Sequence, residues 1–75
     1  MNKVHEQKDS FVRHELLTLM QAIDKDILRL EYRVHNNGEE TVTIVRLTST
    51  GEVYKPINVT GDSLAALARD VLKYI

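Results

Sequence analysis

The sequence predicts an α+β domain with the element order α-β-β-β-α. Apolar residues recur at helical spacing near both ends of the chain, and side chains alternate between apolar and polar in its middle part. Turns that contain glycine separate these segments. We therefore expect a three-stranded antiparallel meander that carries both helices on one face. Residues 9–75 form the single domain of this prediction, and residues 1–8 form a flexible N-terminal tail.

The first helix is expected to begin near Ser10, because Asp9 and Ser10 are favourable N-cap residues. Apolar side chains follow at steps of three and four, namely Val12, Leu16, Leu19, Met20, Ile23 and Ile27. From Leu28 the period changes to two, which predicts a half-buried strand over residues 28–35. An alternative is a first helix that continues to about residue 34, followed by a β-hairpin and a helix, since its apolar spacing also fits.

Asn37-Gly38 predicts a two-residue type I′ turn, which needs positive φ at both central residues. Residues whose numbers add up to 75 then face one another across the two strands. In this register the helices cover the side chains of Leu28, Leu30, Tyr32, Val45 and Leu47. Val42 and Ile44 face the opposite, uncovered side of the sheet.

A second turn is predicted over residues 48–52, with Gly51 in the left-handed position of a G1 bulge and Thr48 paired with Glu52. The third strand should be an edge strand, because Pro56 has no backbone donor. Val53, Ile57 and Val59 would face the helices, and Tyr54 would face outward.

The last helix should begin after Asp62, which we expect as its N-cap. Apolar residues then recur at helical spacing, namely Leu64, Leu67, Ala68, Val71, Leu72 and Ile75.

Composition and motifs argue against several classes of function. The chain has no cysteine, and its net charge of −1 gives no bulk attraction to nucleic acid or to an anionic membrane. The N-terminus has no apolar region typical of a signal peptide, so we expect a cytoplasmic protein with no membrane partner.

No catalytic, cofactor-binding or metal-ligating residues are expected, and the chain is predicted not to be an enzyme. His5, His14 and His35 have no metal-ligand spacing. Glu39, Glu40 and Glu52 are expected to be exposed turn residues. The isolated glycines form no phosphate-binding loop.

The uncovered side of the sheet and the end of the last helix are the candidate interaction surface. Its predicted members are Arg29, Arg33, Val42, Ile44, Arg46, Tyr54, Tyr74 and Ile75. Arginine, tyrosine and aliphatic side chains together are typical of protein interfaces. Alternatively, the arginine stems shield Val42 and Ile44 from water, with Glu31 paired to an arginine.

We therefore expect a small non-enzymatic protein that acts through protein–protein contact. The favoured form is a homodimeric accessory or regulatory protein of bacterial or phage type. The alternative is a weak nucleic-acid-binding protein that uses Arg29, Arg33, Arg46 and Tyr54.

The order α-β-β-β-α also resembles that of the double-stranded-RNA-binding domain over most of the chain. That family presents lysines to phosphates at the start of its last helix. The matching segment here is the acidic Gly61-Asp62-Ser63-Leu64, so nucleic acid is the disfavoured partner and no site residues are carried over.

Overall fold

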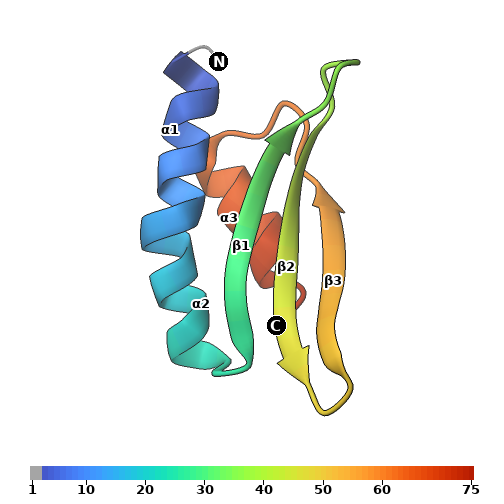
Figure 1. The fold of residues 1–75 in the computed structure, drawn as a ribbon. Helices are drawn as coiled ribbons and strands as arrows, with labels where there is room; N and C mark the ends of the chain where they lie inside the picture. Colours follow the sequence, from blue (N-terminus) through green and yellow to red (C-terminus); the bar gives the residue numbers. More distant parts are fainter. Residues whose placement is uncertain (1–2) are drawn as a thin grey trace.

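A computed structural model describes residues 3–75 and shows the predicted α-β-β-β-α order. The elements are α1 (Lys3–Phe11), η1 (Val12–Leu16), α2 (Leu17–Ile23), β1 (Ile27–Val34), β2 (Glu40–Thr48), β3 (Gly51–Asn58) and α3 (Leu64–Leu72). The strands form one antiparallel sheet in the order β1-β2-β3, with the helices packed against it (Figure 1). Side chains from α3, the N-terminal helical segments and the sheet share one core.

The first helix begins at Lys3, so the predicted start near Ser10 is wrong. Residues 3–8, assigned to a flexible tail from the sequence, form its first turns. The α1, η1 and α2 segments follow one another without a break, and η1 is π-helical.

The π-helical segment keeps one side of this helix on the core. The buried positions lie four residues apart, namely Lys8, Val12, Leu16 and Met20. Three such steps would rotate the buried side by about 120° in a regular α-helix of 3.6 residues per turn. The wider turn of η1 offsets part of this drift. Leu19 and Ile23, expected on the apolar face, are exposed.

The helix ends at Ile23, because Asp24 takes an extended conformation and its side chain accepts a hydrogen bond from the Asp26 backbone. Strand β1 begins at Ile27, after three intervening residues. The alternative of a helix to residue 34 is therefore wrong.

The first hairpin differs by one residue from the expected register. Leu30 pairs with Ile44, and Tyr32 pairs with Val42. The reason is the turn: His35 N donates to Glu39 O at 2.7 Å, which leaves a three-residue loop. Gly38 has φ +89°, and positive φ occurs only at glycines in the described residues, so a type I′ turn does not form.

The second hairpin is also one residue from its expected register, because Thr48 pairs with Gly51 and not with Glu52. Gly51 has positive φ as predicted. The two differences cancel for β3, whose Ile57 and Val59 are buried as expected. In β2 alone, the side chains expected to face the helices lie on the opposite side of the sheet, and those expected on the opposite side face the helices.

A β-bulge lies between Ile27 and Arg29 in β1. Ile27 and Leu30 both belong to the core, so Leu28 lies outside it. The expectation that Leu28, Val45 and Leu47 face the helices is therefore wrong, whereas it is confirmed for Leu30 and Tyr32.

The last helix is capped by Ser63 rather than by Asp62. The Ser63 hydroxyl accepts a hydrogen bond from the Ala66 backbone at 3.2 Å. Asp62 has a buried Oδ2 atom, and burial together with the neighbouring Asp70 carboxyl raises its pKa. Leu67 and Val71 are the buried residues of α3.

Candidate functional site

The sheet face opposite the core has no second layer of secondary structure among the described residues (Figure 1). We call it the open face. Strand alternation and the observed pairing give its members as Arg29, Glu31, Arg33, Thr41, Thr43, Val45, Leu47, Glu52, Tyr54, Pro56 and Asn58. Both signs of charge are therefore present on it.

Val45 is 0% exposed although it lies on the open face, outside the main core. Its two cross-strand neighbours are Arg29 and Tyr54. Arg29 Nε contacts Glu31 at 2.9 Å, Arg29 Nη2 contacts Glu52 at 3.4 Å, and the Tyr54 hydroxyl donates to Glu52 at 2.8 Å. This network shields Val45 from water, as the alternative interpretation expected for Val42 and Ile44.

The network also fixes the charge states of its members. The hydrogen bonds from Tyr54 and Arg29 lower the pKa of Glu52. The hydrogen bonds from Arg29 to Glu31 and Glu52 raise the pKa of Arg29. The Arg29 charge is thus largely balanced within the face.

A shallow hollow lies on the open face beyond this network. Its lining residues are Glu31, Arg33, His35, Thr41, Thr43, Tyr54 and Pro56. His35 Nε2 and Thr41 Oγ1 are 3.0 Å apart. The Arg33 side chain is exposed and makes no hydrogen bond or ion pair within residues 3–75.

The predicted interaction surface is divided among three places. Arg29, Arg33 and Tyr54 lie on the open face, as expected. Val42 and Ile44 are fully buried in the core, so their predicted exposure is wrong. Of the remaining members, Arg46 and Tyr74 meet on the helix side of the sheet, and Ile75 follows Tyr74 and is 39% exposed.

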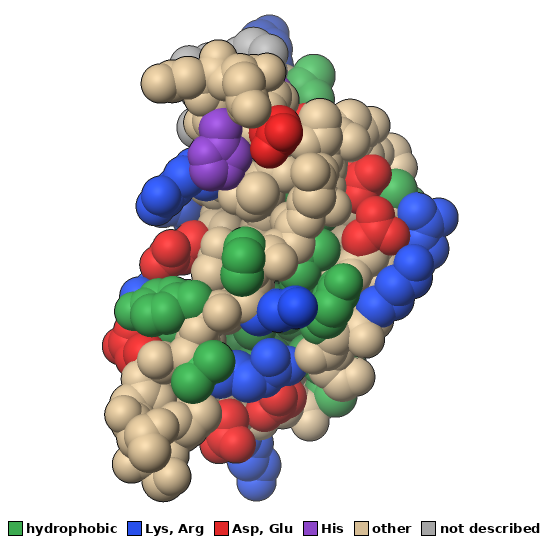
Figure 2. Space-filling model, turned by 90° about the vertical axis from the view of Figure 1, so that its right-hand side faces the viewer, with side chains coloured by type: hydrophobic (Ala, Val, Ile, Leu, Met, Phe, Trp, Pro, Cys, Tyr) green, Lys and Arg blue, Asp and Glu red, His purple; other side chains and the backbone are tan. Residues whose placement is uncertain are grey.

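The helix side of β3 is only partly covered, because Lys55 points to this side and is exposed. Figure 2 shows the β3 side of the molecule, where cationic side chains lie among hydrophobic ones. Arg46 Nε binds Asp24 at 3.0 Å, and its Nη2 donates to the Tyr74 carbonyl at 2.8 Å. Lys55 Nζ lies 4.9 Å from the centre of the Tyr74 ring. Val53 points to this side but is 49% exposed.

These positions weaken the nucleic-acid hypothesis. Of its three arginines, Arg46 is on the other side of the sheet and bound to Asp24, and Arg29 contacts two glutamates. Arg33 alone offers an unpaired guanidinium within the described residues.

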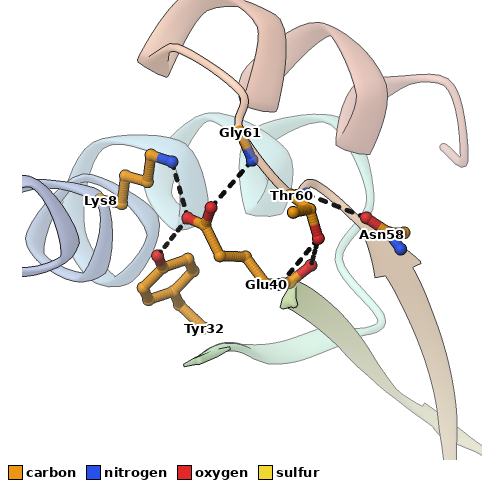
Figure 3. Close-up of polar contacts among 6 residues, drawn as sticks. All are labelled: Lys8, Tyr32, Glu40, Asn58, Thr60 and Gly61. Carbon is orange, nitrogen blue, oxygen red and sulfur yellow. Dashed lines mark hydrogen bonds and ion pairs between the residues drawn. The ribbon is translucent and has the colours of Figure 1, made fainter. Parts of the chain in front are cut away.

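A buried polar cluster joins the first helix, the sheet and the loop before α3 (Figure 3). Lys8 Nζ and the Tyr32 hydroxyl each contact Glu40 Oε1 at 2.6 Å, and the Gly61 amide donates to Glu40 Oε2 at 2.9 Å. Thr60 Oγ1 accepts from the Glu40 amide at 2.9 Å. Both charged side chains are nearly inaccessible to water.

The carboxylate of Glu40 is held ionised. Burial alone would raise its pKa, but the hydrogen bonds from Lys8, Tyr32 and Gly61 outweigh burial and lower the pKa to about 2. Burial and the bond to Glu40 raise the pKa of Tyr32. These bonds hold α1, the sheet and the loop before α3 together, which is a structural role.

Sequence reasoning missed this cluster. It placed Lys8 in the tail and Glu40 in an exposed turn, and the second expectation is wrong. The sequence did contain a signal for the burial of Lys8, because Lys8 continues the four-residue spacing of the buried helix positions.

The three histidines lie in separate places. The ring of His5 is 6.5 Å from that of Tyr32, His14 is exposed on η1, and His35 borders the open-face hollow. Within the described part of the chain, no group of three or more His, Cys, Asp or Glu side chains could hold a metal ion. Among residues 3–75, no helix is both long and apolar enough to cross a bilayer.

Neither models of known protein families, nor curated proteins, nor solved structures give a match to this chain.

Proposed function

We propose that the chain is a small non-enzymatic protein that acts through protein–protein contact and forms a homodimer through its open face. The observation that carries this proposal is a three-stranded sheet whose second face is not covered by any other element of residues 3–75. Tyr54 and Leu47 supply apolar area on this face, being 56% and 53% exposed. An accessory or regulatory role remains part of the same proposal.

Charge complementarity supports a second copy as the occupant. Arg33 lies near the first hairpin in β1, and Glu52 lies near the second hairpin in β3, at the diagonally opposite corner of the face. A two-fold axis in the plane of the face can therefore bring each Arg33 against Glu52 of the other copy. The diagonal between these residues spans two strand spacings of about 4.8 Å and six residues at about 3.3 Å each, so the strands of the two sheets would cross at roughly 50°. This angle lies between the aligned and the orthogonal modes of sheet packing.

The size of the face predicts a weak dimer. Three strands about 4.8 Å apart and eight residues at about 3.3 Å each give a face of roughly 14 by 26 Å. Two such faces together cover roughly 700 Å², which is below the figure of about 1,000 Å² expected of a stable interface and suits a weak, transient one. We therefore expect association in the micromolar range.

Sedimentation equilibrium from low to high micromolar concentration tests the proposal. We expect a concentration-dependent dimer that Arg33→Glu weakens with little loss of fold stability, because the Arg33 side chain has no partner among the described residues. Tyr54→Ala should also weaken the dimer, but it uncovers Val45 and so lowers fold stability as well. Lys25→Glu is the matched control, since Lys25 is exposed, lies outside the sheet and undergoes the same charge change. A monomer at every concentration, or equal weakening by the control, would contradict the proposal.

A further inference from the structure

The outer edge of β1 is a second uncovered feature, distinct from the open face. In an antiparallel ladder, alternate residues direct their backbone groups toward the neighbouring strand. His35 bonds across to Glu39, so Arg33 and Glu31 direct theirs toward β2 as well. The backbone groups of the intervening residues, Leu30, Tyr32 and Val34, therefore point away from the sheet.

A hollow runs along this edge. Five consecutive β1 residues, 29–33, line it on one side, and Arg13 and Leu17 of the first helix line it on the other. Consecutive residues of one strand point to both faces of the sheet, so this hollow lies at the edge of the strand and not on a face. The Gln21 side chain donates to the Ile27 and Leu28 carbonyls and so closes the beginning of the same edge.

The charged lining is mainly cationic, with Arg13, Arg29 and Arg33 against Glu31. Asp9 and Glu52 pair with Arg13 and Arg29 from outside the hollow. The Arg13–Asp9 pair is an exposed i,i+4 ion pair, which contributes little to fold stability. Arg13 can therefore leave Asp9 for an acidic group of a partner at small cost in free energy. On the helix side of the hollow, half-buried Leu17 offers an apolar contact.

We propose that an extended segment of a partner protein, with alternating acidic and apolar side chains, adds to β1 as a fourth strand in this hollow. Backbone hydrogen bonds to Leu30, Tyr32 and Val34 give the affinity, and side-chain alternation gives the specificity. Acidic side chains on the open side meet Arg33, whose side chain has no partner among the described residues, and Arg13 of the first helix adds positive charge across the same hollow. Apolar side chains on the helix side meet Leu17.

A second copy of the chain does not fit this edge. The helix that packs on β1 also lines the hollow, so pairing two β1 strands would bring two such helices together. Paired strands lie about 4.8 Å apart, whereas packed helices need about 8–10 Å. The opposite edge is guarded by Pro56, which cannot donate to an added strand.

Fluorescence anisotropy with labelled peptides tests this proposal. The probe is a blocked peptide of alternating glutamate and valine, and the control peptide has lysine in place of glutamate. We expect the acidic peptide to bind and the basic one not to bind at low salt. Two further peptides carry N-methyl groups on either the glutamate or the valine amides, and one of the two should fail to bind, because only one set of amides faces β1.

Protein variants test the location. Arg13→Glu should weaken binding of the acidic peptide about tenfold. Arg69→Glu is the matched control, because both arginines are about two-thirds exposed and pair with a nearby aspartate. Absence of binding, equal binding of both charge types, equal binding of the two methylated peptides, or an equal effect of the two variants would overturn the proposal. Arg13 is not on the open face, so this proposal and the homodimer can fail separately.

Discussion

At the scale of single residues, Glu40 accepts hydrogen bonds from three separate parts of the chain. Lys8 belongs to α1, Tyr32 to β1, and Gly61 to the loop before α3. The Glu40 backbone also bonds to Val59 and Thr60. Sequence patterns describe local structure, so they do not show which distant groups meet at a buried glutamate.

We predict that Glu40→Gln lowers the free energy of unfolding by about 3 kcal/mol. The substitution leaves the buried Lys8 ammonium without a charged partner, and breaking one side of a buried ion pair costs about 3–5 kcal/mol. Such a loss is large against the roughly 4–11 kcal/mol expected for a domain of this length. Urea unfolding monitored by circular dichroism measures the change.

Glu39→Gln is the control for this prediction, because Glu39 is the exposed neighbour and undergoes the same chemical change. We expect it to alter the free energy of unfolding by less than about 0.5 kcal/mol. Equal effects of the two substitutions would show that the buried cluster does not stabilise the fold.

At the scale of elements, β2 shows where sequence reasoning succeeds and where it does not. Its existence and its two partners follow from β-branched residues and flanking turns. The sequence does not show which side chains of β2 face the helices, because Ile44 and Val45 are both apolar and both buried. Ile44 is buried on the helix side of the sheet and Val45 on the open face. A strand with apolar residues on both faces leaves the register to the turn, and Asn36-Asn37-Gly38 forms a three-residue loop.

The exchanged faces of β2 give a direct test. Ile44→Ala should lower the free energy of unfolding by about 2–5 kcal/mol, because it removes a fully buried side chain and leaves a cavity. Thr43→Ala, one residue away on the open face, should cost less than about 1 kcal/mol. Thermal and urea unfolding of both variants check the difference, and a larger loss for Thr43→Ala would favour the register expected from a two-residue turn.

At the scale of the whole molecule, the element order and the two-layer arrangement could be predicted, because both depend on periodicity and turn residues. The candidate surface could be predicted only in part. Arg29, Arg33 and Tyr54 share one face as expected, whereas Arg46 and Tyr74 meet on the other side of the sheet. A one-residue difference in register sends every side chain of a strand to the opposite face, so a surface list depends on a detail that local pattern does not settle.

Acid stability is a property of the whole fold that depends on Glu40. The pKa of Glu40 falls from an ordinary value of 4.5 to about 2 in the folded protein. The unfolded chain therefore takes up this proton first as the pH falls. The stabilisation of about 3 kcal/mol that corresponds to this shift is present above pH 4.5 and is lost as the pH falls from 4.5 to about 2.

We therefore predict that the free energies of unfolding of the parent protein and of Glu40→Gln differ most near pH 7 and converge as the pH approaches 2. Asp24, Glu52 and Asp70 also have lowered pKa values and add an acid-dependent loss, whereas Asp62, with a raised pKa, acts in the opposite direction. These four groups are present in both proteins, so the difference between the two curves isolates Glu40. Urea unfolding at a series of pH values gives both curves. If the curves stay parallel down to pH 2, the contacts with Lys8 and Tyr32 do not stabilise the ionised form of Glu40.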